Sequence, residues 1–390
     1  MIIRDDAFGQ TYFLITARTP KCLLAKISFA NYYPIMSKSI LLFVIIFLVT
    51  SSLHAQNAKD LANVTTAFVE TLPTDQKSAV YFEFSDSIRT EWTNLPIGLA
   101  PRSGLKFGDL SEESKVKFHR VLSKIFSSQG YLKVFTIMQV DDILHEIMEI
   151  AYQREEMNEN TIKMIRTLDW DYGNYFIAIM GDPSLDEIWG LKFEGHHLSL
   201  NLTVSGDEFS MTPIFLGSDP ALVEVTQYAG LRPLSKEEDY GFWFVNTLDE
   251  EQKAKATLSE KVPGDILTSP GRDQWINEFK GIKGSELNQD QQEILHYLIE
   301  EYVNNLDHPK AEEYLAILHA HGMDEVYFTW IGSYEPMKAH YYMIHSPDFI
   351  IEYDNVGFLD NANHIHTIWR ENGNDFGADI LKQHRLAHQH

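Results

Sequence analysis

The chain has 390 residues, a formal net charge of −24 and 44% hydrophobic residues. Its length and apolar content allow one large or two ordinary globular domains with a sizeable core. The acidic balance argues against a surface for nucleic acid or anionic membranes, because such surfaces need clusters of Lys and Arg.

The first element along the chain is an apolar run, Ile40–Val49, which follows a basic start near Met36 and precedes small and polar residues up to Ala55. This order is typical of a signal peptide, and the run is shorter than the roughly 20 residues that span a bilayer. We therefore expect residues 36–55 to be a signal peptide and residues 1–35 to be a spurious N-terminal extension. The mature protein is then periplasmic or secreted, with no stable membrane insertion after cleavage.

Residues 56–390 would form the mature chain, which has 335 residues and a net charge of −27, because the removed part carries five Lys or Arg and two Asp or Glu. The single cysteine, Cys22, lies in the removed part. Disulfides, thiolate metal ligands and cysteine catalysis are thereby excluded from the mature chain. Because no linker-like or low-complexity segment interrupts residues 56–390, we expect one compact domain.

Two parts of the mature chain resemble each other at a nearly constant spacing. The matching pairs are Thr71–Ala79 with Thr247–Lys255, at an offset of 176, and the predicted helices Leu110–Phe126 and Leu287–Val303, at an offset of 177. Apolar residues recur three and four positions apart in both helices, which predicts one buried stripe on each. Ser111 and Asn288 are good N-caps for the two helices.

Short strands rich in aromatic and β-branched residues follow in each part. They are Asn174–Met180, Trp189–Glu194 and Leu198–Thr203 in the first part, and Val326–Ile331, His340–His345 and Phe349–Asp354 in the second, the last two pairs at an offset of 151. The smaller offset is explained by a helical segment, Val140–Thr167, that only the first part contains. The stretch Ser205–Asp239, rich in Pro and Gly, is typical of connecting loops.

These patterns predict an α+β fold that is internally duplicated. Each half, about 60–204 and 240–355, is a unit of helices followed by an antiparallel meander, and the two units pack as one compact domain. The alternative is a chance likeness between amphipathic helices. A functional site at the junction of two such halves would be natural.

Histidines are concentrated toward the C-terminus, where eleven of the sixteen lie between His296 and His390. His364 and His366 are two positions apart in a predicted strand, so their side chains point to the same face. This spacing suits metal chelation. The alternative interpretation is a pair of polar residues on a solvated strand face.

A second histidine pair, His196 and His197, precedes the strand Leu198–Thr203. In a regular strand His196 shares a face with leucines, which favours His197 as a ligand, although a bulge at Gly195 would reverse this assignment. In the second half, His345 occupies the position that aligns with Glu194.

Together these residues suggest a metal site with nitrogen ligands for zinc, copper or iron. The expected ligands are His345, His364, His366 and one of His196 and His197. Glu194 or Glu352 would act as a general base, and Arg370 would anchor an anionic group. No phosphate-binding Gly-rich loop, Gly-x-Ser-x-Gly or His-Glu-x-x-His motif occurs in the sequence, so serine nucleophile chemistry has no support.

Several motifs together resemble the domain-of-unknown-function family 3500, a group of mostly bacterial secreted proteins. They are Glu194–Asn201, Gly230–Leu234 with Glu237 and Glu238, Tyr341–Pro347, Ile351–Asn355, Asn363–Arg370 and Asp375–Gly377. The likeness covers nearly all of the mature chain, with a departure at Met343, where the family pattern leads us to expect a basic residue. The resemblance implies a secreted single-domain protein and names no reaction.

The sequence therefore predicts a secreted, metal-dependent enzyme, a hydrolase rather than a redox catalyst, that acts on a small-molecule or extracellular substrate. The alternative is a non-catalytic extracellular ligand-binding protein, in which the same histidines and the aromatic residues Trp189, Tyr342 and Trp369 line a cleft. A third interpretation gives the polar residues a purely structural role between the two halves.

Overall fold

The computed structural model describes residues 2–5, 11–14, 57–184, 186–272, 276, 278–357 and 362–387. The chain divides into two compact units, residues 1–49 and 50–390. In the first unit, β1 (Ile2–Asp5) pairs antiparallel with β2 (Thr11–Leu14). The predicted signal peptide at 36–55 lies outside the described residues, and everything below concerns the second unit.

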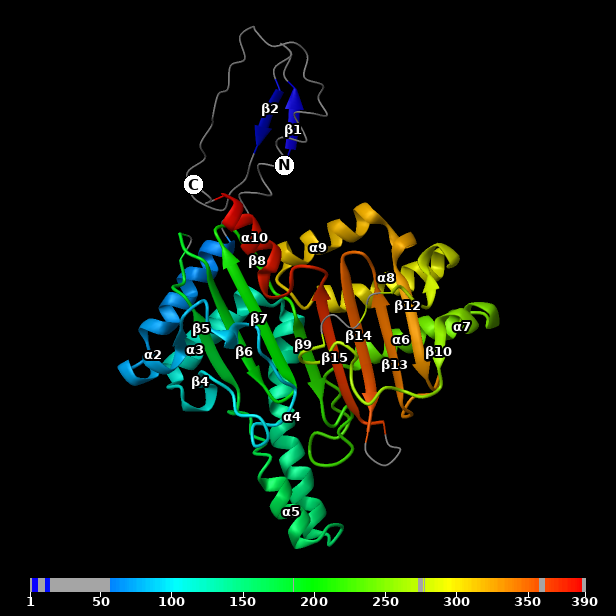
Figure 1. The fold of residues 1–390 in the computed structure, drawn as a ribbon, viewed down its shortest axis with the longest axis horizontal. Coiled ribbons are helices and arrows are strands. Elements are labelled where there is room, and N and C mark those ends of the chain that lie inside the picture. The colour runs from blue at the N-terminus through cyan, green and yellow to red at the C-terminus, as the bar shows by residue number, and fades with distance from the viewer. Residues whose placement is uncertain are drawn as a thin grey trace. The chain divides into compact units, whose positions relative to one another are not determined.

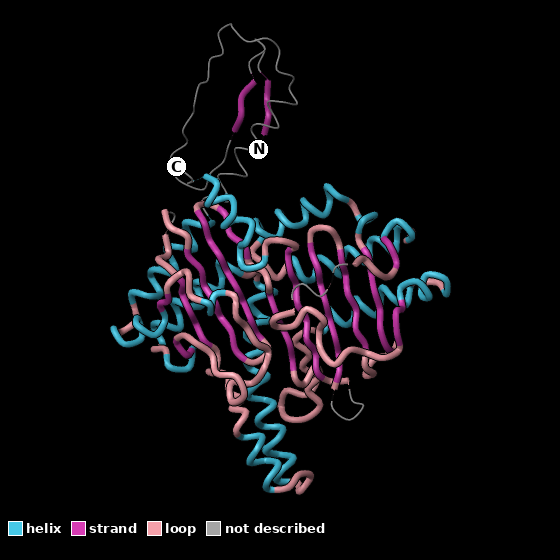
Figure 2. The backbone as a smooth tube through the Cα atoms, viewed as in Figure 1, coloured by secondary structure: helices cyan, strands magenta, loops and turns pink. Residues whose placement is uncertain are grey.

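One 13-stranded sheet runs through the second unit (Figures 1 and 2). In sheet order its main strands are β10 (Thr257–Ser259), β12 (Tyr327–Gly332), β13 (His340–His345), β14 (Phe349–Val356), β15 (His364–Glu371), β9 (Ile214–Ser218), β7 (Leu198–Ser205), β6 (Trp189–Gly195), β5 (Phe176–Met180) and β3 (Tyr81–Phe82). The short strands β11 (Ile282–Lys283), β4 (Leu105–Lys106) and β8 (Glu208–Ser210) pair with β12, β5 and β7. Neighbouring strands are antiparallel except at β3 and β10, which each run parallel to their neighbour.

Helices pack against one face of this sheet (Figure 1). In the first half they are 57–70, α2 (Thr74–Val80), α3 (Glu112–Ile125), α4 (Ser128–Gln153) and α5 (Glu159–Arg166); later come α6 (Ser235–Thr247), α7 (Glu250–Ala256), α8 (Gln289–Val303) and α9 (His308–His321). The last helix, α10 (Ala378–Ala387), lies on the other face, where Ser205 of β7 contacts His384. Ser111 and Asn288 cap α3 and α8 as predicted, each accepting a backbone N–H with its side chain. Among the described helices, none has the length and apolar content to cross a membrane.

The predicted α+β class is confirmed by this combination of helices with a mostly antiparallel sheet. Read from its two ends inward, the sheet has the order β3, β5, β6, β7, β9 on one side and β10, β12, β13, β14, β15 on the other, with β9 and β15 pairing in the middle. Two related halves that pair with each other through their last strands would produce this mirrored strand order. The duplication itself stays a prediction.

Two stretches differ from the expected elements. The stretch Ser205–Asp239, interpreted as loops, contains β8, the central strand β9 and the start of α6. Cis peptide bonds precede Pro213 and Pro220 on either side of β9, so the prolines that indicate loops here bracket a buried strand. The predicted segment Val140–Thr167 is divided between the outer part of α4 and α5.

The second face of the sheet carries buried polar side chains beneath two long loops, 83–104 and 260–281. The ammonium of Lys192 on β6 donates to the carbonyl of Ile88 in the first loop at 3.0 Å. The carboxylate of Glu352 on β14 accepts the backbone N–H of Thr268 in the second loop at 2.9 Å. Polar side chains on this face therefore hold the loops in place, because a buried polar group needs a partner.

Candidate metal centre

Three imidazoles meet at one end of the central strands. His197 lies in the turn between β6 and β7, and His364 and His366 lie at the start of β15. The Nε2 atom of His364 is 2.8 Å from Nε2 of His197 and 3.0 Å from Nε2 of His366. An imidazole nitrogen carries either one proton or one lone pair, so His364 Nε2 cannot complete a good hydrogen bond with both neighbours. Ligand atoms about 2.1 Å from one metal are about 3.0 Å apart at a right angle and about 3.4 Å apart at the tetrahedral angle. The contacts of 2.8 and 3.0 Å are therefore close to the spacing of metal ligands and about 0.4–0.6 Å shorter than in an ideal tetrahedral site.

The backbone around His197 forces its ring toward His364. His197 has a φ of 60°, in the left-handed region that few non-glycine residues adopt, and its carbonyl accepts the N–H of Gly217 at 2.7 Å. A Cβ atom at Gly217 would lie 2.7 Å from Cδ2 of His197 and 2.9 Å from the carbonyl oxygen of Ile365. Gly217 therefore leaves the space that the His197 ring occupies.

Carboxylates orient two of the histidines through Nδ1. Asp265 Oδ1 lies 2.9 Å from Nδ1 of His366, and Asp141 Oδ1 on α4 lies 2.7 Å from Nδ1 of His196. Asp141 also accepts the hydroxyl of Tyr175 at 2.7 Å. A carboxylate at Nδ1 fixes the proton there and leaves Nε2 with a free lone pair, which is the arrangement found around metal-ligating histidines.

Three groups of residues in the described part of the chain could hold a cation, because their ligand atoms lie within 4.8 Å of one another. They are His197, His364 and His366; Asp141, His196 and His197; and Asp265, Asp354 and His366. The groups share His197 and His366, so they form one continuous cluster. The first group alone offers three imidazoles, and His196 adjoins it, with its ring centroid 3.7 Å from that of His197.

Burial controls the protonation of this cluster. Burial, together with the neighbouring imidazoles, lowers the pKa of His197 and His364 well below the usual value, which favours their neutral, metal-binding form. Burial also disfavours protonated His366, but the hydrogen bond to Asp265 and the charge of Asp354 outweigh it and raise the pKa of His366. Burial raises the pKa of Asp219 to about 6 and that of Asp354 to about 7.

A cavity of about 320 Å³ opens beside the three histidines. Its polar lining near the cluster comes from Asp219, Asn363 and His364, and the Oδ2 atom of Asp219 lies 3.7 Å from Nδ1 of His364. Its apolar walls are formed by Leu144, Ile147, Met148, Ile150 and Ala151 of α4 and by Pro220, Leu222 and Val225. A small molecule in this cavity would therefore contact the edge of the cluster.

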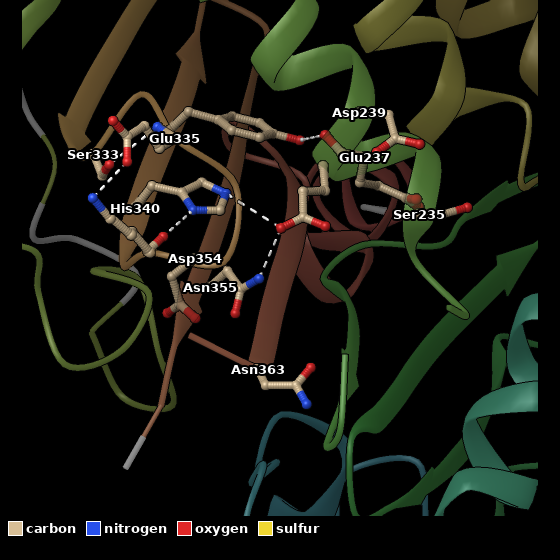
Figure 3. A network of polar contacts seen from close by, with 12 residues as sticks. Ser235, Glu237, Asp239, Ser333, Glu335, His340, Asp354, Asn355 and Asn363 are labelled. Atoms are coloured by element: carbon tan, nitrogen blue, oxygen red, sulfur yellow. Dashed lines mark hydrogen bonds and ion pairs between the residues drawn. The ribbon is translucent and has the colours of Figure 1, made fainter. Parts of the chain in front are cut away.

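A hydrogen-bond network at the end of β14 supports the start of β15, and Figure 3 shows the part of this network around His340 and Asn355. Asn355 on β14 accepts the backbone N–H of His364 at 3.1 Å and donates to Oε1 of Glu238 on α6 at 2.9 Å. His340 on β13 is directed toward the same carboxylate, with Nε2 3.9 Å from Oε1 of Glu238. The backbone of His364 is thereby tied to α6 as well as to β14.

His345, expected as a ligand, lies outside the cluster. The strand register pairs His345 with Ile350 and Ile350 with Arg370, which is four residues along β15 from His366. Four residues of a strand span about 13 Å, so His345 cannot share an ion with His366. Its ring instead packs on Phe279 at 4.4 Å, and burial lowers the pKa of His345 to about 4.

The three residues expected to be catalytic are engaged elsewhere on the loop-covered face. Glu352 accepts hydrogen bonds from the 260–281 loop and from the hydroxyl of Tyr341 at 2.7 Å. Arg370 donates to the carbonyl of Thr268 at 2.8 Å and pairs with Asp375. Glu194 lies 3.7 Å from Lys192 and 3.9 Å from Arg102. None of the three belongs to the groups of ligand atoms found among the described residues.

Sequence reasoning missed the carboxylates of the centre, Asp141, Asp219 and Asp265. Asp141 lies inside a helix and Asp265 in a long loop, and the histidines that they contact are 55 and 101 residues away in the sequence. Asp219 lies in the stretch interpreted as a loop. The one local signal is the dipeptide Asp219-Pro220, which marks a chain reversal and not a ligand.

The model of one protein family, described as "Protein of unknown function (DUF3500)", matches residues 54–378. This confirms the resemblance predicted from the motifs. No curated protein and no solved structure matches the chain.

Proposed function

The chain belongs to the DUF3500 family of proteins of unknown function, and we propose that it is a metal-dependent hydrolase whose ion is bound by His197, His364 and His366. The observation that carries the proposal is the contact of His364 Nε2 with two further Nε2 atoms, at 2.8 and 3.0 Å. Uncharged imidazoles cannot satisfy both contacts, whereas one shared cation satisfies all three nitrogens.

Zinc is the metal that this ligand set favours. Three imidazole nitrogens with an open position are typical of catalytic zinc sites, and the carboxylate at Nδ1 of His366 fits the supporting arrangement of such sites. Copper and iron also accept imidazole and are the other outcomes of a metal analysis. A zinc ion here would acidify a bound water and polarise a substrate carbonyl.

Asp219 is the carboxylate that we assign as the general base. It borders the cavity, and its Oδ2 atom lies 3.7 Å from Nδ1 of His364, the ring nitrogen that does not bind the ion, so we place it to accept a proton from a water or substrate on the cavity side of His364. Sequence reasoning gave this role to Glu194 or Glu352, whose carboxylates contact Lys192 and the 260–281 loop. His196, next to His197 and bound to Asp141, would position the His197 ring or complete the ligand set.

Export is also part of the proposal. The segment 36–55 would direct the chain to the periplasm or the medium, and the mature chain would then meet an extracellular small-molecule substrate. Fractionation of cells that express the chain with and without residues 36–55 tests this step, because only the longer form should leave the cytoplasm.

Elemental analysis of the purified protein tests the metal. We expect about one ion per chain in the wild type and none in the double variant His364→Ala/His366→Ala. His345→Gln is the matched control, because it removes a buried histidine outside the cluster and should leave the metal content unchanged. A metal-free wild type whose unfolding is insensitive to a chelator would sink the proposal.

The non-catalytic alternative draws on the apolar walls of the same cavity. A ligand-binding protein would bind an apolar molecule there without converting it. Turnover of ester, amide and phosphoester substrates by the zinc-loaded protein, compared with the double variant, distinguishes the two. Metal-dependent turnover supports the hydrolase, and ligand binding without turnover supports the alternative.

A further inference from the structure

We infer that the cavity beside the histidines takes an uncharged carbonyl compound with an apolar chain, and that the chain lies along α4. The inference rests on the proposed function, because the ion would bind the carbonyl end. It adds the class of the substrate, which the three histidines alone do not specify.

The apolar wall of the cavity is one face of α4. Leu144, Ile147, Met148 and Ala151 follow one another at the spacings of three and four that align side chains on a helix. Leu144 is buried, and the other three are half-buried. A partly exposed apolar stripe that borders a cavity gains stability when a ligand covers it.

The dimensions of the wall suit a chain of several carbons. From Leu144 to Ala151 the helix rises about 10 Å. Leu222 and Val225, in the segment that follows β9, form a second apolar wall. Apolar side chains therefore come from two parts of the chain. The cavity volume of about 320 Å³ lies at the lower end of the range for small-molecule sites.

The charges at the outer end of the cavity, away from the metal, disfavour a ligand whose chain ends in an anionic group. Its outer lining carries the exposed residues Arg154, Glu156 and Glu224, which give two negative charges against one positive charge. The chain as a whole has a net charge of −24, and such a background repels anions. An uncharged chain with a polar head at the metal fits both the walls and the charges.

The wall belongs to the part of the molecule that differs between the halves. α4 has 26 residues and is followed by α5, whereas α9, the helix that follows α8 in the second half, has 14. Figure 1 shows α4 and α5 extending past the ends of the strands, at the bottom of the view. The additional helix length thus lies on the side of the histidine cluster, where it forms a wall of the cavity.

Binding of alkyl hydroxamic acids tests the inference, because each is uncharged in solution near pH 7, chelates zinc as the hydroxamate with release of its proton to the buffer, and carries an alkyl chain of chosen length. Calorimetric titration of the zinc-loaded full chain should show affinity rising about fourfold for each methylene between acetohydroxamate and octanohydroxamate. The variant Ile147→Ser should flatten this rise and leave the metal content and the affinity for acetohydroxamate unchanged. Leu132→Ser is the control, because Leu132 is an exposed residue of α4 outside the cavity lining.

The outcomes separate the two proposals. A zinc-loaded protein that binds all hydroxamates equally well would overturn the inference and leave the metal centre intact. An equally steep rise in Ile147→Ser would place the chain elsewhere and overturn it too. A protein that binds no zinc contradicts the proposed function itself, which elemental analysis shows before any titration.

Discussion

Gly217 is the residue on which the position of His197 depends. A Cβ atom there would lie 2.7 Å from His197 Cδ2 and 2.9 Å from the carbonyl oxygen of Ile365, and the backbone of a central strand cannot move away cheaply. We predict that Gly217→Ala weakens zinc binding at least about tenfold, because the ring is displaced, and costs about 1–3 kcal/mol of stability. Competition with a zinc chelator measures the first effect, and urea unfolding of the zinc-free protein measures the second.

Gly264→Ala is the matched control for this prediction. A Cβ atom at Gly264 meets nothing within 4 Å, and Gly264 precedes Asp265, the partner of His366. The control should therefore retain both zinc affinity and stability. Equal zinc affinity in Gly217→Ala and the wild type would mean that His197 is not a ligand.

At the residue scale, the sequence predicted which histidines share one face of a strand. It did not predict which residues from different strands and loops come together in the cluster. The two-residue spacing of His364 and His366 was enough to place both on one face of a strand. His345 could not be placed, because its position depends on the register between β13, β14 and β15, and no residue in the sequence specifies that register. Asp141 and Asp265 come from elements over 50 residues away from the histidines that they contact.

A buried charge network joins α4, α6 and α8. Lys133 donates to Glu237 at 2.7 Å and to Glu301 at 2.6 Å, and all three residues are buried. We predict that Lys133→Met costs about 3–5 kcal/mol at pH 7, because it leaves the buried carboxylate of Glu237 without its cation and leaves Glu301 with only Lys236, at 3.4 Å. Urea unfolding compares the variant with Lys124→Met, which removes a half-exposed ion pair with Asp60 and should cost no more than about 1 kcal/mol.

The loss in Lys133→Met should shrink as the pH falls. Burial raises the pKa of Glu237, and Lys133 partly opposes this effect, so removing Lys133 raises that pKa further. A carboxyl group with a higher pKa in the folded state binds more protons there than in the unfolded state. The variant therefore gains stability relative to the wild type as the pH falls from 7 toward 5. The same loss at both pH values would show that the missing volume of the side chain, and not its charge, causes it.

Elements with a clear hydrophobic period could be predicted from the sequence. Strands that form only because neighbouring strands pair with them could not. The stripes and caps of α3 and α8 are local properties, and the structure has both helices within two residues of the predicted bounds. β9 is five residues long and lies between two prolines. It forms a strand because β7 and β15 pair with it on either side, and pairing partners are a property of the whole fold.

The sheet of the second unit divides into a half that runs from β3 to β9 and a half that runs from β10 to β15, and these two halves share more than the β9–β15 pairing. The N–H of Ser127, between α3 and α4, donates to the carbonyl of Asn305 at 3.0 Å, and the N–H of Asp307, before α9, donates to the carbonyl of Ile125 at 2.9 Å. The largest core cluster contains buried apolar residues of both halves. Neither half can therefore unfold and leave the surface of the other intact.

This continuity predicts one cooperative unfolding transition, with equal calorimetric and van't Hoff enthalpies. His197 comes from the first half and His364 and His366 from the second, so a bound ion links both halves. Zinc at about a hundredfold excess over its Kd should raise the Tm of the whole transition by about 3–5 °C, and the double variant His364→Ala/His366→Ala should show no shift. Scanning calorimetry with and without zinc measures both effects. Two separate transitions, or a shift confined to one of them, would show that the halves are independent and that the ion binds within one half.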